Sequence, residues 1–188
     1  MCSCEKTFEF DLRPWRNSVT SFEVPDNAPL TLALDPSFTA HETSDESSLA
    51  LGWLDEMNYL RVVDIRASRW KGISLADIVV DFCERQTIQN IRIEQSPFFD
   101  LLSDAIRLKG EIRTIPIPPI TSAHVTTPKG DRFKRLQRTA ENGGIVLRNG
   151  SFVSSLLEEL ERFCFASKTN HRAPDNRIDS LCLLANFR

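Results

Sequence analysis

The sequence has 188 residues, of which 41% are hydrophobic and 26% are charged, and its formal net charge is −3 at pH 7. These values suit one soluble globular domain. No apolar run approaches the ~20 residues that span a bilayer, and the first fifteen residues lack the layout of a secretory signal. We therefore expect a cytoplasmic protein with no membrane contact. The negative charge argues against a strongly basic nucleic-acid binder, but it allows an enzyme with a local basic patch around an acidic centre.

The five cysteines are an odd number and are mostly far apart in the chain. Cys2 and Cys4 form a close pair, but no second pair of cysteines or histidines stands at zinc-site spacing. The other three lie among apolar residues and are expected in the core. The sequence thus gives little support to a structural zinc site.

The hydrophobic pattern places a mixed α/β domain at residues 30–188. Residues 1–29 show no clear period and contain three prolines, so we interpret them as a linker or as an arm packed on the domain. Strands are predicted at 31–34, 48–54, 59–65, 91–93, 113–117 and 145–147. Helices are predicted at 74–85, 97–109, 131–141, 152–163 and 175–185.

The order of these elements favours one kind of sheet. Three consecutive strands precede the first helix, which suggests an antiparallel meander, and the later alternation of helices and strands suggests parallel βαβ units. We expect a mixed five-stranded sheet flanked by helices.

Two acidic residues follow apolar strand segments directly. Asp35 comes after Leu-Ala-Leu, and Glu94 comes after Ile-Arg-Ile. If the first and fourth strands are parallel neighbours, both carboxylates emerge at the same edge of the sheet, where ligands collect in such folds. An acid after a strand is also a common turn or capping residue, so the position alone leaves both interpretations open.

A third acidic position opens the last predicted helix. Asp175 follows Pro174, and Asp179 lies one turn further on the same face. Asp175 also suits a helix N-cap, which would explain it without any catalytic role. Acids that converge without a basic partner repel one another unless a divalent cation neutralises them, and oxygen ligands suit Mg²⁺ or Mn²⁺. Two such ions could activate water and stabilise the leaving oxygen of a phosphodiester.

Four patches of sequence between Leu30 and Leu184 occur in a characteristic order. They are Leu32-Ala-Leu-Asp35-Pro36 followed by Ser44-Asp45, Ile91-Arg-Ile-Glu94, Lys129-Gly-Asp131-Arg132 leading to Glu141-Asn-Gly143-Gly-Ile-Val146, and Asp175-Asn-Arg-Ile-Asp179-Ser-Leu181. Through these patches the chain resembles the nuclease domain of the large terminase subunit of tailed phages and herpesviruses, which belongs to the RNase H-like superfamily.

This resemblance implies roles for the acids and for two bound Mg²⁺ or Mn²⁺ ions. Asp35 would bridge the metals, Glu94 would hold one of them, and Asp175 would complete the catalytic set, with Asp179 as a further ligand. The sequence departs from the family pattern at Asn176, where a second aspartate is usual, and at Ser180, where the family has alanine. Asn176 can still supply an oxygen and is an auxiliary candidate.

A basic stretch between Lys129 and Arg148 is the candidate DNA-binding patch, because Lys and Arg contacts to phosphate give sequence-independent affinity. A solvated helix face is the alternative explanation for such a charge run. The patch comprises Lys129, Arg132, Lys134, Arg135, Arg138 and Arg148. Arg66, Arg69 and Lys71 form a second basic group that could flank the same groove. His171, four residues before Asp175, could orient water or a metal ligand.

The leading hypothesis is a metal-dependent endonuclease that cuts concatemeric double-stranded viral DNA during genome packaging. The sequence contains no G-x-x-x-x-G-K-[ST] loop, so this chain cannot be the ATPase motor that packaging needs. An ATPase domain, a portal or a small terminase subunit would be its partners, in the cytoplasm of a bacterial host. The alternatives are an RNase H-like resolvase or transposase, or a catalytically degenerate domain that binds DNA or a protein partner.

Overall fold

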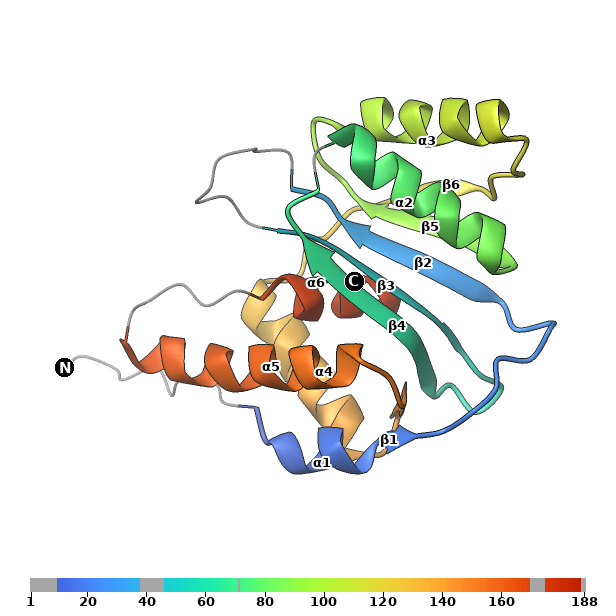
Figure 1. The fold of residues 1–188 in the computed structure, drawn as a ribbon. Coiled ribbons are helices and arrows are strands. Elements are labelled where there is room, and N and C mark those ends of the chain that lie inside the picture. Colours follow the sequence, from blue (N-terminus) through green and yellow to red (C-terminus); the bar gives the residue numbers. More distant parts are fainter. Residues whose placement is uncertain (1–9, 38–45, 71, 170–174, 187–188) are drawn as a thin grey trace.

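The computed structural model describes residues 10–37, 46–70, 72–169 and 175–186, and it shows a mixed sheet with helices on both faces (Figure 1). The strands are β1 (Val19–Thr20), β2 (Leu30–Asp35), β3 (Ser47–Leu54), β4 (Leu60–Ser68), β5 (Ile88–Glu94), β6 (Ile120–Ala123) and β7 (Ile145–Arg148). The helices are α1 (Leu12–Asn17), α2 (Gly72–Arg85), α3 (Phe99–Arg113), α4 (Lys129–Glu141), α5 (Phe152–Thr169) and α6 (Asn176–Leu184). The mixed α/β class predicted from the sequence is confirmed.

The described strands form one seven-stranded sheet in the order β1-β7-β4-β3-β2-β5-β6. Strand β3 is antiparallel to both of its neighbours, β2 and β4, and all other pairs are parallel. The predicted meander followed by parallel strands is therefore present. Every strand except β3 points its carboxyl end toward the same edge of the sheet, which we call the carboxyl edge.

The strand predicted at 113–117 is wrong, and so is the predicted end of the preceding helix at residue 109, just before Gly110. Helix α3 continues to Arg113 and ends at Thr114, whose φ of 57° is left-handed. A Cβ atom at position 110 would lie 2.3 Å from Cγ1 of Ile117. Gly110 therefore permits close packing of the following segment against the helix, and the strand forms only after Pro119. This strand, β6, and the short β1 belong to a sheet of seven strands rather than the expected five.

The described part of the N-terminal arm, residues 10–29, packs on the domain. It contributes α1 and the edge strand β1, which pairs with β7. Trp15 is fully buried, and its indole Nε1 donates a hydrogen bond of 2.9 Å to Oε1 of Gln137 in α4. Burial of a large aromatic side chain stabilises the folded state by a few kcal/mol. The arm is therefore integrated into the core through Trp15.

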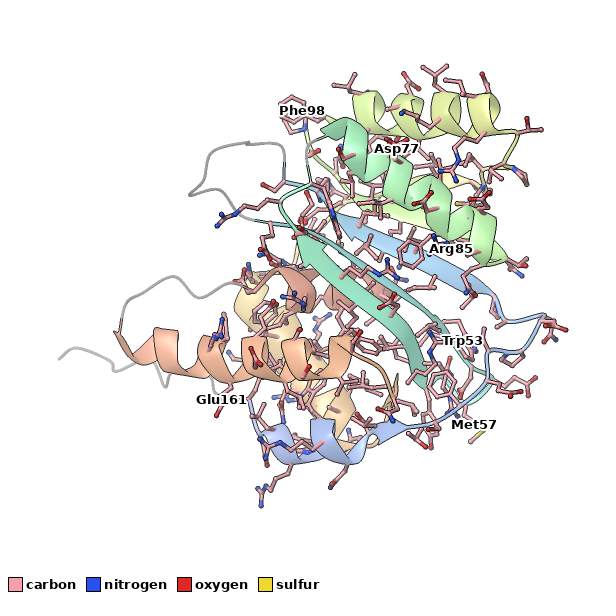
Figure 2. All side chains as sticks on the ribbon, in the orientation of Figure 1. Trp53, Met57, Asp77, Arg85, Phe98 and Glu161 are labelled. Atoms are coloured by element: carbon pink, nitrogen blue, oxygen red, sulfur yellow. The ribbon has the colours of Figure 1, made fainter. Side chains whose placement is uncertain are left out.

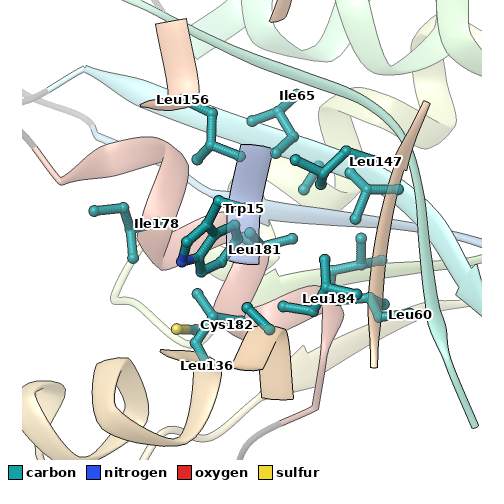
Figure 3. Packing of buried hydrophobic residues seen from close by; sticks show 14 of the residues in the cluster. Trp15, Leu60, Ile65, Leu136, Leu147, Leu156, Ile178, Leu181, Cys182 and Leu184 are labelled. Atoms are coloured by element: carbon teal, nitrogen blue, oxygen red, sulfur yellow. The ribbon is translucent and has the colours of Figure 1, made fainter. Parts of the chain in front are cut away.

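Two apolar clusters cover the two faces of the sheet. Alternate strand residues point to opposite faces, so Leu32 and Leu34 of β2 pack under α2 and α3, whereas Ala33 belongs to the cluster under α4, α5 and α6. Figure 3 shows Ile178, Leu181 and Cys182 of α6 within the second cluster, near Trp15.

Small residues let α6 lie close to the centre of the sheet. Ala33 of β2 and Ala50 of β3 are both fully buried in the cluster that contains α6. A Cβ atom on Gly52 would lie 3.1 Å from Cδ2 of Leu184 and 2.2 Å from the backbone oxygen of Arg61. The missing side chain at Gly52 therefore makes room for Leu184 at the end of α6 and for the neighbouring strand β4.

Among the helices that the structure describes, none combines the length and the apolar character needed to cross a membrane.

Candidate active site

The strand order brings Asp35 and Glu94 together at the carboxyl edge. Strands β2 and β5 are parallel neighbours in which Leu34 lies beside Ile93, so the next residue of each strand, the acid, is at the same level. Because Leu34 and Ile93 face α2 and α3, both acids face the opposite side of the sheet, where α6 lies. Arg92 has the same orientation as Glu94, and its Nη1 donates a hydrogen bond of 3.0 Å to the carbonyl oxygen of Leu183 in α6.

Helix α6 adds Asp179 to this pair of acids. The side chain of Asp179 is only 9% exposed. The pKa of Asp35 is raised to about 8, first by burial, then by the carboxylate of Glu94, and further by the charge of Asp179. Burial likewise raises the pKa of Asp179 to about 6, against the opposing effect of Lys129. Three carboxyl groups therefore share a poorly solvated site, and their mutual repulsion is large.

Lys129, at the start of α4, holds the two acids of α6. Its Nζ lies 2.7 Å from Oδ2 of Asp175 and 2.6 Å from Oδ2 of Asp179. Burial alone would lower the pKa of Lys129, but the two aspartates raise it. The structure thus gives Lys129 a position inside the acidic site, whereas the sequence suggested the DNA-binding patch.

Arg132 is also turned inward and is only 6% exposed, so we correct its prediction as a surface contact for DNA. Its Nη2 lies 3.4 Å from Oδ1 of Asp179, which has no hydrogen-bond partner within the described part of the chain. Arg132 lies one turn after Pro128 on the buried face of α4, beside Phe133 and Leu136. The periodicity of α4 could have indicated this orientation.

Asp175 occupies the N-cap position of α6 but makes no capping hydrogen bond with its side chain. The capping explanation for Asp175 therefore does not apply, and its carboxylate is directed to Lys129 instead. Asn176 is buried, and its backbone oxygen accepts a hydrogen bond from Oγ of Ser48 in β3. His171 lies outside the described residues.

Glu159 of α5 is a buried acid that sequence reasoning missed. Its Oε2 accepts a hydrogen bond of 3.0 Å from Nη1 of Arg177, and its Oε1 accepts one of 3.0 Å from the backbone N–H of Ile178. Burial raises the pKa of Glu159 in spite of these bonds. Glu159 therefore positions the first turn of α6, from which Asp179 projects. Its only sequence signal was a charge beside the apolar positions Leu156 and Leu160.

A cavity of 340 Å³ opens between the β5–β6 edge and α6. Arg92, His124 and Cys182 contribute to its wall, and Glu94 is paired in register with Ala123, another wall residue. The Nδ1 atom of His124 lies 2.8 Å from Oε1 of Gln95, the residue after Glu94. The structure thus places His124 near the acids, although nothing in the sequence linked them.

The rest of the basic patch extends away from the acids. Lys134, Arg135 and Arg138 are exposed on α4, which runs from the carboxyl edge to the opposite edge of the sheet. At 1.5 Å per residue, Arg138 lies about 13 Å from Lys129 along the helix. Arg148, at the end of β7, is half-buried. By the register of the sheet it lies about four residues from the acids, toward the edge opposite the carboxyl edge.

The second basic group does not flank the same side. The guanidinium of Arg66 lies 4.7 Å from the ring centre of Phe82 in α2, on the face opposite the acids. Lys71 is outside the described residues. The structure therefore separates Arg66 from the acidic site.

The acids suit a hard divalent cation in the chemistry of their donors. They offer carboxylate oxygens, including the buried Oδ1 of Asp179, which accepts no hydrogen bond in the described part of the chain, and Mg²⁺ and Mn²⁺ prefer such ligands. In the described residues, no three His, Cys, Asp or Glu side chains are placed to hold a metal ion as they stand. Lys129 instead neutralises Asp175 and Asp179. The residue types therefore fit the cation, and the side chains would have to rearrange around it.

Comparisons with known proteins place the fold. The chain matches no protein-family model and no curated protein sequence. Among solved structures, it is similar to the large terminase nuclease from thermophilic phage G20c with bound magnesium, with 12% identity, coverage of 94% of this chain and 96% of that chain, and a TM-score of 0.60.

Two further solved structures are similar. The nuclease domain of the large terminase subunit of bacterial virus Sf6 has 12% identity, coverage of 92% of this chain and 96% of that chain, and a TM-score of 0.53. The yeast mitochondrial Holliday junction resolvase has 13% identity, coverage of 92% and 84%, and a TM-score of 0.49. The two terminase structures confirm the predicted fold: the chain has the RNase H-like architecture of phage large terminase nuclease domains.

Proposed function

We propose that this protein is a metal-dependent endonuclease that hydrolyses phosphodiester bonds in double-stranded DNA. The observation that carries the proposal is the convergence of Asp35, Glu94 and Asp179 on one face of the sheet at its carboxyl edge. A protein tolerates such a concentration of buried like charge when a ligand of opposite charge relieves it.

Asp35, Glu94 and Asp179 would hold Mg²⁺ or Mn²⁺, with Asp175 and Asn176 beside them. When bound, two such ions supply an activated water and stabilise the leaving oxygen of the phosphodiester. Asp35 is central to this set because its pKa responds to both Glu94 and Asp179. Binding of the cation would require Asp35 to lose its proton, since the ligand is the carboxylate.

Residues of α4 would orient the site and contact DNA. Lys129 and Arg132 hold Asp179 from the α4 side. Lys134, Arg135 and Arg138 would contact phosphates along the exposed face of the same helix, which is the part of the predicted patch that remains accessible.

We propose a role in viral genome packaging on the basis of the similarity to phage terminase nucleases. The sequence resemblance to that family points in the same direction. Because packaging needs ATP-driven translocation, an ATPase domain or subunit, a portal or a small terminase subunit would act with this domain. Its place of action would then be the cytoplasm of a bacterial host.

One observation favours a second candidate, a degenerate domain that binds DNA without cutting it. Lys129 already supplies a positive charge to Asp175 and Asp179 at distances of 2.7 and 2.6 Å. A permanent ammonium in this position reduces the electrostatic demand for a metal. The two candidates differ in whether added metal produces cleavage.

Supercoiled plasmid incubated with the full chain and Mg²⁺, Mn²⁺ or a chelator separates them. We expect metal-dependent nicking that Asp35→Asn and Glu94→Gln abolish. Asp26→Asn, which changes an exposed acid outside the site, is the matched control and should cut normally. Cleavage by Asp35→Asn at the wild-type rate would remove the assigned site, and DNA binding without cleavage under all metals would establish the degenerate domain.

A further inference from the structure

Helix α3 carries an apolar stripe on its outer face. Phe98, Leu101, Leu108 and Ile112 are 45%, 67%, 57% and 69% exposed, and they are four of the seven large hydrophobic residues that are exposed in the described chain. Ala105 is half-buried between them. Figure 1 shows α3 at the outer boundary of the molecule, and Figure 2 shows Phe98 at its start. Contiguous exposed apolar residues of this kind mark interaction surfaces.

The spacing of the stripe is that of a helix which pairs with another helix. Phe98, Ala105 and Ile112 repeat every seven residues, and Leu101 and Leu108 fall between them, which gives intervals of three and four residues. These are the a and d positions of a heptad repeat. Leucine at both d positions and a β-branched residue at one a position favour a parallel pair of helices. The core-facing residues of α3 lie away from the stripe, with Ser103, Ile106 and Gly110 turned into the molecule and Leu102 on the flank that also carries Lys109.

The charges that flank the stripe select a partner. Asp104 and Glu111 lie on one flank, at the g positions, and Lys109 lies on the other flank, at an e position. In a parallel pair, a g residue faces the e residue five positions further along the other helix. Asp104 of one copy would therefore face Lys109 of the second copy, and the same contact would recur by symmetry. In an antiparallel pair, the g positions of the two helices would face each other. The acidic flank of one copy would then lie against the acidic flank of the second copy, and the two would repel.

We propose that α3 is the interface with a second copy of this chain, in a parallel two-fold pair built on the stripe from Phe98 to Ile112. The ion pairs that Lys109 and Asp104 make within one copy hold these charges in place. Nζ of Lys109 lies 2.8 Å from Oδ1 of Asp77 in α2, and Nη1 of Arg107 lies 3.2 Å from Oδ1 of Asp104. Asp104 remains 76% exposed and Lys109 31% exposed, so both can reach a second copy.

A parallel pair has a consequence for the acids. Glu94 ends β5, and α3 begins five residues later, so the start of α3 lies at the end of the molecule that carries the acids. A two-fold axis parallel to both α3 helices would place the two acidic sites at the same end of the dimer. The proposal does not depend on whether those sites cut DNA.

Sedimentation velocity of the full chain over a concentration series tests the interface. Because the seam is only two heptads long, we expect a dimer with a dissociation constant between about 1 µM and 1 mM, as is usual for small interfaces. Leu108→Glu should abolish association, while circular dichroism reports an intact fold. Leu54→Glu, at an exposed leucine of the β3–β4 hairpin, should leave association unchanged. A chain that remains monomeric up to about 1 mM, or a Leu108→Glu dimer, would overturn the proposal.

A charge exchange tests the parallel arrangement. Asp104→Lys and Lys109→Asp should each weaken the dimer about tenfold, because each reverses two symmetric contacts. The double variant should recover most of the loss, since it restores the pairs with opposite sign. If Asp104→Lys strengthens the dimer, or if the double variant is as weak as the sum of the single ones, the helices do not pair in parallel.

Discussion

The stability of the metal-free protein should fall as the pH rises from 6 to 8, and Asp35→Asn should remove most of this fall. Burial, Glu94 and Asp179 raise the pKa of Asp35 to about 8 in the folded state, whereas an unfolded aspartate titrates near ~3.9. The folded chain therefore holds a proton that the unfolded chain has released. Its contribution to stability is complete below the unfolded pKa and is lost as the pH rises through the folded pKa.

The size of the effect follows from one proton. Each pH unit in this window costs up to 2.303RT, or about 1.4 kcal/mol, until the pH reaches the folded pKa. With a folded pKa of about 8 for Asp35, the loss between pH 6 and pH 8 sums to about 2 kcal/mol. Asp179 has a pKa of about 6 and is therefore half titrated where this window begins. It adds only about 0.4 kcal/mol to the loss between pH 6 and pH 8.

Urea unfolding at several pH values, with a chelator present, measures the effect. The quantity to compare is the free energy of unfolding of wild type minus that of Asp35→Asn, since other titrations common to both proteins cancel. This difference should become more negative by about 2 kcal/mol from pH 6 to pH 8. Asp26→Asn, at an exposed acid, should follow wild type at every pH. If wild type and Asp35→Asn lose stability in parallel, Asp35 is not the protonated group, and the description of the acidic site is wrong.

Three further predictions concern the residues that position and serve the site. Glu159→Ala should destabilise the fold by about 2–3 kcal/mol in urea unfolding, because it removes a buried acceptor of two hydrogen bonds. Glu158→Ala removes an exposed ion pair on the same helix and should cost less than about 0.5 kcal/mol. Equal losses in the two variants would refute the positioning role of Glu159. Gly52→Ala should cost about 1–3 kcal/mol in urea unfolding, since its Cβ would lie 2.2 Å from a backbone oxygen. Gly130→Ala should be near neutral in the same assay, because a Cβ there meets nothing within 4 Å. Arg138→Ala should weaken DNA binding and reduce the slope of log K against log salt by about 0.9, the share of one phosphate contact; an unchanged slope would exclude Arg138 from the DNA surface.

Local pattern was enough to predict the strand-end acids. An apolar run that ends in an acid identifies both the strand and its last residue, so Asp35 and Glu94 stood out before any packing was known. The parallel pairing of β2 and β5 was only a condition of the prediction, and the structure shows that it holds. Alternation along the strand also fixes the face of each acid, since the residue before it is a buried apolar one.

The region after α3 was predicted incorrectly because its outcome depends on long-range packing. Glycine commonly ends a helix. Gly110 instead lies inside α3, where the absence of a side chain makes room for Ile117. The left-handed Thr114 ends the helix instead. The hydrophobic periodicity of the segment indicates neither the contact between Gly110 and Ile117 nor the left-handed backbone of Thr114.

The positions of Asp35 and Glu94 at strand ends, and the side of the sheet that each faces, follow from local sequence, because strand periods depend on neighbours in the chain. The basic residues that pair with Asp175 and Asp179 became known only from the packing of the helices. Lys129 and Arg132 belong to a basic run that suggested a DNA surface, but α4 packs with its first turn against α6 and turns both side chains toward Asp179. The period of α4 can indicate that Arg132 faces inward. Its partner Asp179 lies some fifty residues further along the chain, and no local pattern identifies a partner at that separation.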